Sequence, residues 1–321
     1  MNTLFHPSVS AHPSARAGDA PGQTLGLGTA PLGSQPDGPL WWGPQDRDVA
    51  VATVVAAIDA GALFVDTAPF YGWGRAEEIV GEAIRDLPAR PPVLTKCGTV
   101  PDPNTRSTED HSRDAIRADV EASRSRLGLD VIDAVQVHDP DPATPIETTW
   151  ESLMELVSNG TVAAAGLSNH PVELMERALT VGPIGVVQHQ YSLLVRDAES
   201  DGVLDWCAAR GIPFLAWSPL ASGFLVDDFD VEATHSTDLR RRLRWASSEH
   251  DRTQRTRSAL QTLAEEHDTT MVAVALAWVT RRPGVYAIVG ARNPAEAELL
   301  GRPLPLLTNE DVQLLDQAGS A

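Results

Sequence analysis

Residues 163–190 read AAAGLSNHPVELMERALTVGPIGVVQHQ, and this stretch contains the unit that recurs along the chain. A short apolar run over 163–168 is followed by a helical pattern over 171–179 and by a β-branched run over 186–190. Short continuous apolar runs are typical of buried strands, and longer segments with a 3.6-residue period are typical of helices. The stretch therefore predicts a strand, a crossover helix and a second strand parallel to the first.

The same alternation covers most of the chain. Predicted strands lie at 25–30, 63–67, 93–96, 131–138, 163–168, 186–190, 213–217 and 285–289. Predicted helices lie at 48–59, 75–87, 110–127, 146–158, 171–179, 201–210, 252–281 and 294–300. Glycine follows four of these helices, at Gly61, Gly128, Gly160 and Gly211. Glycine just past a last helical turn adopts the left-handed conformation that ends a helix, which supports these boundaries.

Two α/β folds fit parallel strands joined by helices: a doubly wound open sheet and a closed (β/α)8 TIM barrel. Eight units without a break favour the barrel. The open sheet normally carries G-x-G-x-x-G after its first strand, whereas here Gly26-Leu-Gly-Thr-Ala-Pro-Leu-Gly33 has a different spacing and places Pro31 where a helix should begin. We predict one barrel domain over 23–321, preceded by a disordered leader over 1–22.

Composition excludes several classes of partner. The 321 residues include 25 Lys plus Arg and 44 Asp plus Glu, a net charge of −19. This charge argues against nucleic acid and against an anionic membrane surface. No apolar stretch is long enough to span a bilayer, and residues 1–22 lack the pattern of a secretory signal. Two cysteines, Cys97 and Cys207, favour a reducing compartment, so we expect a cytoplasmic protein.

Two insertions follow predicted strands at their C-terminal ends, over 33–44 and 222–250. In a barrel these ends form the face that carries the chemistry. Long loops at that face are often functional lids, although a solvated surface loop would also fit the pattern.

Four chemically distinct side chains follow successive predicted strands: Asp66, Tyr71, Lys96 and His138. This combination suits proton transfer to a carbonyl oxygen. A nearby ammonium favours phenolate and should lower the pKa of Tyr71, while a carboxylate would hold the lysine in place. An imidazole can orient the substrate oxygen. Asp66, Lys96 and Tyr71 would form a relay, with His138 positioning the substrate.

Each of these residues taken alone has an ordinary structural explanation, such as a cap, a packing aromatic or a solvated strand end. Their placement on successive strand ends is what favours catalysis. Lys96 is also the only lysine in the chain, because every other basic residue apart from histidine is arginine. A compact ammonium with a tunable pKa differs from a permanently charged planar guanidinium, so the use of lysine here by a chain that otherwise uses arginine favours a role that needs the compact charge.

The chain resembles the aldo-keto reductases over about residues 24 to 318. The stretches that carry the resemblance are Leu25-Gly-Leu-Gly-Thr, Asp66-Thr-Ala-Pro-Phe-Tyr71-Gly, Leu94-Thr-Lys96, Ser125-Arg-Leu-Gly-Leu-Asp-Val-Ile-Asp133, Gly166-Leu-Ser-Asn169, Trp217-Ser-Pro-Leu220 and Ile288-Val-Gly-Ala-Arg292. The resemblance implies a TIM barrel that binds a nicotinamide dinucleotide, with Asp66, Tyr71, Lys96 and His138 as its catalytic tetrad. No metal is implied.

The same resemblance implies a cofactor site. Ser168, Asn169 and Gln188 would hold the nicotinamide carboxamide, because that group needs donors and acceptors in one plane. Trp217 would stack on the nicotinamide ring, although a core aromatic is the alternative. Further cofactor contacts would come from the residues near the pyrophosphate and the adenosine, which are Ser218, Leu220, Gly223, Gly290, Arg292 and Glu296.

The adenosine end leaves the choice of cofactor open. Arg292 could meet the 2′-phosphate of NADP, whereas the carboxylate of Glu296 would repel it and could accept a hydrogen bond from a free 2′-hydroxyl. Leu300 also replaces a frequent Asn of the family. We expect NADP(H) to be slightly preferred over NAD(H).

The expected activity is hydride transfer between NAD(P) and an aldehyde, ketone or sugar carbonyl, a small-molecule partner. Trp41, Trp42, Phe70 and Trp73 are predicted to line the substrate pocket, and its specificity stays open. The alternative function is a cofactor-sensing, weakly active subunit of a larger assembly. A short-chain dehydrogenase would need Tyr and Lys one helical turn apart, and Tyr71 and Lys96 are too distant in sequence. The sequence indicates no oligomeric state.

Overall fold

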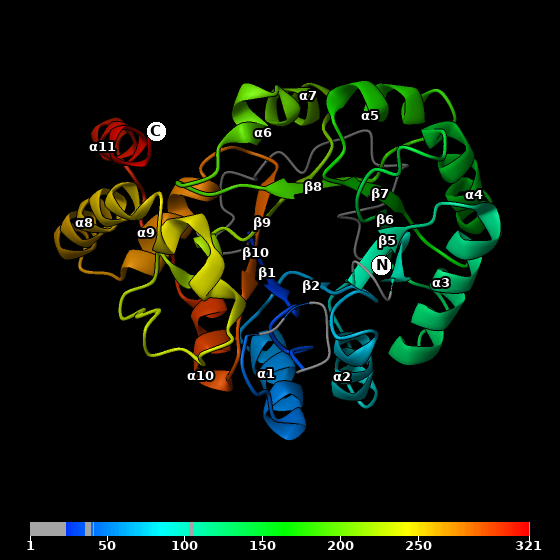
Figure 1. Ribbon diagram of the computed structural model, residues 1–321, viewed down its shortest axis with the longest axis horizontal. Coiled ribbons are helices and arrows are strands. Elements are labelled where there is room, and N and C mark those ends of the chain that lie inside the picture. Colours follow the sequence, from blue (N-terminus) through cyan, green and yellow to red (C-terminus); the bar gives the residue numbers. More distant parts are fainter. Residues whose placement is uncertain (1–23, 36–39, 41, 103–105, 321) are drawn as a thin grey trace.

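The computed structural model describes residues 24–35, 40, 42–102 and 106–320. Eight parallel strands close into a barrel in the order β1-β10-β9-β8-β7-β6-β3-β2, and helices surround them (Figure 1). This confirms the predicted TIM barrel. The barrel strands are β1 (Leu25–Gly28), β2 (Val65–Asp66), β3 (Val93–Cys97), β6 (Ala134–Val137), β7 (Ala165–Ser168), β8 (Val186–Gln190), β9 (Phe214–Trp217) and β10 (Val285–Gly290).

The surrounding helices are α1 (Arg47–Asp59), α2 (Arg75–Ile84), α3 (Arg113–Leu127), α4 (Ile146–Ser158), α5 (Val172–Leu179), α6 (Asp197–Ser200), α7 (Val203–Arg210), α8 (His250–Glu266), α9 (Met271–Val279), α10 (Pro294–Ala297) and α11 (Asn309–Gly319). Most begin and end within a few residues of the predicted bounds. The predicted leader and Trp41 lie outside the described residues.

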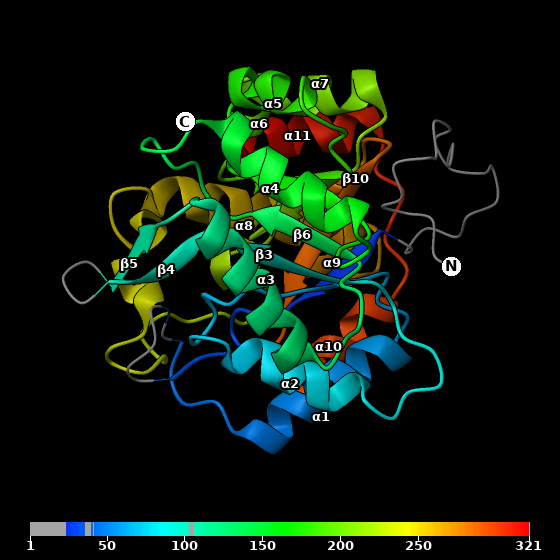
Figure 2. The ribbon, with the colours of Figure 1, turned by 90° about the vertical axis from the view of Figure 1, so that its right-hand side faces the viewer.

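Three features differ from the sequence prediction. The predicted helix over 252–281 is two helices, because Asp268 adopts a left-handed φ of 49° and the Thr270 side chain accepts a hydrogen bond from Ala273 N, which starts α9. A hairpin of β4 (Thr99–Asp102) and β5 (Arg106–Glu109) was not predicted, and it projects beyond β3 (Figure 2). Helix α11 was also not predicted, although Thr308 and Asp311 form a capping box at its start.

An apolar layer fills the barrel below the chemical site. It is contributed by Phe64, Leu94, Ala134, Ala164, Val186, Leu215 and Ile288, which pack as one buried cluster. The ring of Phe64 fits because Gly26 has no side chain: a Cβ at Gly26 would lie 2.3 Å from that ring. Side chains alternate in direction along a strand, so the residues two positions further on point inward as well. This periodicity places a second layer at the C-terminal mouth.

Two glycines bring the loop after β1 against the loop that carries Tyr71. A Cβ on Gly33 would lie 2.5 Å from the Tyr71 carbonyl oxygen, and a Cβ on Gly72 would lie 2.1 Å from the Gly33 carbonyl oxygen. Both distances are shorter than real Cβ contacts, so only glycine permits this crossing. The backbone contact fixes the height of Tyr71 above the barrel.

We predict that Gly72→Ala both destabilises the protein and lowers turnover, because the new Cβ must push the Tyr71 loop away from Gly33. Gly128→Ala is the matched control, since Gly128 has φ 66° against 68° for Gly72 but nothing within 4 Å of its Cβ position. The control should lose only about 1 kcal/mol, the cost of a left-handed alanine. Urea denaturation and steady-state kinetics measure the two effects. Equal losses in the two variants would contradict the crossing.

Candidate active site

The inward positions two residues beyond the apolar layer are polar. Phe64 is followed by Asp66, Leu94 by Lys96, Ala134 by Gln136 and Val186 by Gln188, and all four polar side chains are buried. Gly166 occupies the corresponding position of β7, where a Cβ would lie 3.0 Å from Gln136 Cγ. The barrel therefore changes from an apolar filling to a polar layer at its mouth.

Lys96 is the centre of this layer. Its side chain is 1% exposed, and Nζ donates to Asp66 Oδ1 at 2.7 Å, to the Thr67 carbonyl oxygen at 2.9 Å and to the Tyr71 hydroxyl at 3.2 Å. These three acceptors match the three hydrogens of an ammonium. Burial opposes the charge, but the Asp66 carboxylate and Tyr71 outweigh burial and raise the pKa of Lys96.

Asp66 accepts hydrogen bonds from three side chains. Besides Lys96, Gln188 Nε2 donates to Oδ2 at 2.8 Å and Gln136 Nε2 donates to the same oxygen at 3.3 Å. Gln188 Nε2 also lies 3.2 Å from Gln136 Oε1. Sequence reasoning missed Gln136, although its position two residues before His138 on the same strand was the available signal.

Tyr71 and His138 stand between this buried layer and the open cavity, and each is partly exposed. Burial raises the pKa of Tyr71, and the opposing effect of the Lys96 ammonium does not cancel it. This direction is opposite to the sequence expectation, because desolvation of the phenolate outweighs the nearby positive charge. Burial and Lys96 together hold the pKa of His138 well below its usual value, so the imidazole is neutral.

Aromatic rings form one wall beside these two groups. The Phe70 ring centroid lies 5.7 Å from that of His138 and 6.4 Å from that of Tyr71, in edge-on arrangements. Phe70 and Trp42, two of the residues that we expect at the substrate pocket, line the cavity. Trp73 is not among the cavity-lining residues of the described chain: it packs edge-on against Phe70 at 5.5 Å and supports the wall from behind.

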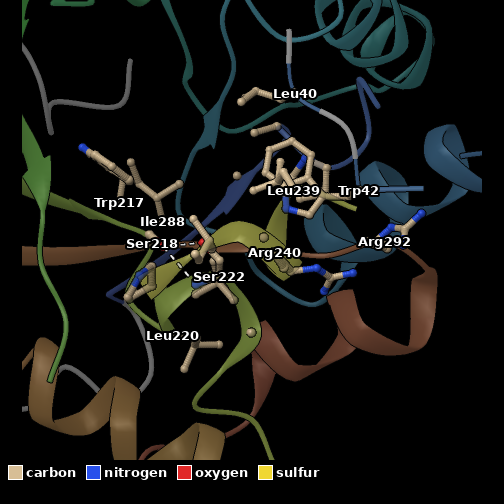
Figure 3. Close-up of a pocket in the computed structure, with 18 of the residues that line it drawn as sticks. Leu40, Trp42, Trp217, Ser218, Leu220, Ser222, Leu239, Arg240, Ile288 and Arg292 are labelled. Carbon is tan, nitrogen blue, oxygen red and sulfur yellow. Dashed lines mark hydrogen bonds between the residues drawn. The ribbon is translucent and has the colours of Figure 1, made fainter. Parts of the chain in front are cut away.

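The cavity has a volume of about 1510 Å³ and opens at the C-terminal ends of the strands. Its walls include parts of both insertions identified in the sequence. Every residue that we expected at the cofactor lines it: Ser168, Asn169, Gln188, Trp217, Ser218, Leu220, Gly223, Gly290, Arg292 and Glu296. Figure 3 shows Trp217 and Arg292 at opposite sides of this cavity, with Ser218, Ser222 and Arg240 between them.

The inner end of the cavity matches a carboxamide. Ser168 Oγ is buried and has no hydrogen-bond partner among the described residues, so it can donate to a carbonyl oxygen. Gln188 uses Nε2 on Asp66 and Gln136, and Asn169 uses Nδ2 on Asp139 Oδ1 at 2.8 Å, so both offer their amide oxygens as acceptors. One donor and two acceptors are what the oxygen and the NH₂ of a nicotinamide carboxamide require.

A tight loop follows β9 in the middle of the cavity. Ser218, Ala221 and Ser222 have left-handed φ values of 54°, 49° and 57°, followed by Gly223 at 99°. Ser218 Oγ accepts a hydrogen bond from Ser222 N at 3.0 Å, which holds the loop closed (Figure 3). Non-glycine residues rarely adopt this backbone, and clusters of such residues occur at ligand-binding sites.

Two guanidinium groups face the outer end of the cavity. Arg240 is paired with buried Asp238 at 2.7 Å. Arg292 Nη2 donates to the Pro44 carbonyl oxygen at 2.7 Å, while the buried Arg292 Nε has no partner in the part of the chain that the structure describes. Burial and the charge of Arg240 lower the pKa of Arg292, and the charges of Asp238 and Glu296, which act in the opposite direction, do not cancel this effect.

Glu296 is occupied by its own helix start. Its Oε2 accepts from Arg292 N at 2.8 Å, and its Oε1 accepts from Asn293 Nδ2 at 2.7 Å. Both carboxylate oxygens therefore accept hydrogen bonds within the turn before α10. Its charge still lies beside Arg292, so it moderates the positive character of this end.

Within the described ranges, no group of three or more His, Cys, Asp or Glu side chains is arranged to hold a metal ion. The same ranges contain no helix that is both long and apolar enough to cross a membrane. The site combines a buried hydrogen-bonded cluster of Asp66, Lys96 and Tyr71 with a neutral imidazole and a large cavity.

Comparisons with known proteins agree with this geometry. The model of the aldo/keto reductase family matches residues 24–319. The aldo-keto reductase YhdN of Bacillus subtilis is 34% identical over 86% of this chain and 83% of its own length. The NADH-specific methylglyoxal reductase of Escherichia coli is 30% identical over 85% of this chain and 86% of its own length. The structure of a glycerol dehydrogenase from Gluconobacter oxydans matches over 94% of this chain and 92% of its own chain, with 31% sequence identity and a TM-score of 0.82.

A family match over nearly the whole chain, relatives at 30% identity or more and a barrel of the same shape lead to one assignment. The chain belongs to the aldo/keto reductase family and is an NAD(P)-dependent oxidoreductase that acts on a carbonyl group or on the corresponding alcohol.

Proposed function

We propose that this enzyme interconverts an aldehyde, ketone or sugar carbonyl and its alcohol, with Tyr71 as the general acid and base. The observation that carries the proposal is the contact of the Tyr71 hydroxyl with Lys96 Nζ at 3.2 Å, at the edge of the cavity. When bound, the nicotinamide supplies the hydride for reduction or accepts it in oxidation. The remaining steps belong to side chains of the chain itself.

In reduction, the substrate oxygen would sit between Tyr71 and His138. Neutral His138 can donate a hydrogen bond that orients the carbonyl, and the Tyr71 hydroxyl transfers its proton to the oxygen as negative charge develops there. The Lys96 ammonium stabilises the phenolate that remains, and Asp66 keeps that ammonium charged and in place. In oxidation the same phenolate takes the proton from the alcohol.

We further propose that the cofactor is NADP(H) in preference to NAD(H). The support is the proximity of Arg240 to Arg292 and the fact that Arg292 Nε has no partner within the described ranges. A 2′-phosphate would pair with Arg292 Nε and relieve the repulsion between the two cations. The substrate is a small carbonyl compound or alcohol, and a cytoplasmic location remains our prediction. Both cysteines are buried and free, which is consistent with a reducing compartment.

We predict that Tyr71→Phe lowers kcat by about 10²- to 10⁴-fold, because proton transfer by a positioned side chain contributes that much. The Kd for NADPH should stay within about threefold, since the hydroxyl is not expected to contact the adenosine end. Following NADPH absorbance with a panel of aldehydes, ketones and sugars measures both. Tyr191→Phe, outside the cavity, is the control. Tight NADPH binding without turnover in the unmodified enzyme would instead favour a cofactor-sensing subunit.

The two directions of the reaction should depend differently on pH. The pKa of Tyr71 is raised, so the phenol keeps its proton through the neutral range and up to the usual phenol value of about 10. The rate of reduction should therefore be flat over this range, whereas oxidation needs phenolate and should rise about tenfold per pH unit. Rate–pH profiles of kcat/KM measure this. A fall in reduction centred near neutrality would mean that Lys96 overcomes burial.

We predict that Arg292→Ala weakens NADPH binding by roughly tenfold, the value of a charge-assisted hydrogen bond, and leaves NADH binding within about twofold. Glu296→Gln should shift the preference toward NADPH, because it removes the neighbouring negative charge. Calorimetric titration with each cofactor measures both effects. Arg302→Ala, an exposed arginine beyond α10, is the control. Equal losses for the two cofactors in Arg292→Ala would contradict a 2′-phosphate contact.

A further inference from the structure

A chain of hydrogen bonds runs across neighbouring strand ends beside the tetrad. Asn169, directly after β7, donates from Nδ2 to Asp139 Oδ1 at 2.8 Å, and Asp139 lies two residues beyond β6. Trp217, the last residue of β9, donates from Nε1 to Asn169 Oδ1 at 2.9 Å. All three side chains line the cavity. The chain spans the mouth from β6 to β9, passing over β8.

The two ends of this chain determine the orientation of the amide between them. An ionised carboxylate only accepts hydrogen bonds, and an indole N–H only donates. The amide of Asn169 therefore has to turn its nitrogen to Asp139 and its oxygen to Trp217. The His138 carbonyl oxygen, 3.3 Å from Asn169 Nδ2, favours the same orientation. A flipped amide would face a carboxylate with its oxygen and an N–H with its nitrogen.

The orientation of Asn169 controls two features of the cofactor site. It leaves Asn169 Oδ1 as an acceptor for the carboxamide NH₂, and it holds the indole of Trp217 by the only polar atom that the ring has. The backbone of Asn169 is itself restrained, with φ at 60° and its N–H on the Gln188 carbonyl oxygen at 2.9 Å. Because the backbone is restrained, what the neighbouring side chains must set is the orientation of the Asn169 side-chain amide.

We propose that Asp139 is a positioning residue. Its ionised carboxylate orients the amide of Asn169 and, through it, the indole of Trp217, so that loss of this charge weakens binding of the nicotinamide. This inference rests on the proposed placement of the nicotinamide against Trp217. Asp139 acts through its neighbours and need not touch the reacting atoms.

The surroundings of Asp139 place its titration near neutrality. Burial, with the charge of Glu109 on β5, raises the pKa of Asp139 to about 6, while the hydrogen bond from Asn169 and the charges of Lys96 and His111 act in the opposite direction. Tyr71 faces it from the loop after β2. Below this pH the carboxyl carries a proton and can donate as well as accept, so both amide orientations become acceptable. Cofactor binding should therefore weaken as pH falls through about 6.

The test is the pH dependence of the Kd for NADH, measured by calorimetry between about pH 5 and 8, because NADH lacks the 2′-phosphate of NADPH, whose second pKa of about 6 would add a pH dependence of its own. In the unmodified enzyme we expect Kd to rise roughly tenfold toward acid, as for loss of one charge-assisted contact. Asp139→Asn should give a Kd that hardly varies with pH and stays near the acid value of the unmodified enzyme. Asp141→Asn, on the same loop, is the matched control and should keep the full pH dependence.

A second variant tests the transmission to the indole. Trp217→Phe keeps an aromatic ring for stacking and removes the N–H, so it should reduce the pH dependence without abolishing it, because the contact of Asn169 Oδ1 with the carboxamide remains. Asp139→Asn should therefore have a smaller effect in the Trp217→Phe background than in the unmodified enzyme. Thermal denaturation checks that each variant folds. A full acid weakening in Asp139→Asn, or additive effects in the double variant, would overturn the positioning role while leaving the proposed function intact. Failure of the unmodified enzyme to bind either NADPH or NADH at neutral pH would overturn both.

Discussion

The pairing of Lys96 with Asp66 at the barrel mouth is the interaction on which the rest of the site depends. Burying an ammonium costs several kcal/mol unless its charge and all its hydrogens are compensated. Here the carboxylate supplies the charge, and Thr67 and Tyr71 supply the remaining acceptors. Tyr71 is consequently part of the solvation of the lysine, and its hydroxyl cannot be moved without leaving a buried donor unsatisfied.

The closed barrel explains how such a pair can be built. Phe64, Leu94 and their neighbours close the barrel below, so water does not reach the ammonium from that side. The next inward positions then carry the charged and amide side chains, each held by its strand rather than by a flexible loop. Groups on rigid strands hold their geometry when substrate arrives, which is the condition for electrostatic stabilisation of a developing charge.

The sequence predicted much of this arrangement because its signals are local. Apolar runs and glycine-ended helices located the eight strands, and strand ends brought Asp66, Lys96 and His138 together. Features that depend on tertiary contacts were beyond such reasoning. The direction of the Tyr71 pKa depends on the balance of burial and charge, and the break before α9 depends on one left-handed residue at Asp268. The position of Gln136 was a signal in the sequence, but its hydrogen bond to Asp66 depends on the register of separate strands.

The strained loop after β9 links the folding stability of the enzyme to its affinity for the cofactor. Ser218, Ala221 and Ser222 each hold a backbone conformation that an unfolded chain seldom visits, so folding rather than ligand capture bears this cost. A dinucleotide that binds there meets a preformed surface. Binding therefore costs less conformational entropy than it would if a flexible loop had to become ordered. Substitutions that remove this backbone strain would therefore make the protein more stable and lower its affinity for the coenzyme.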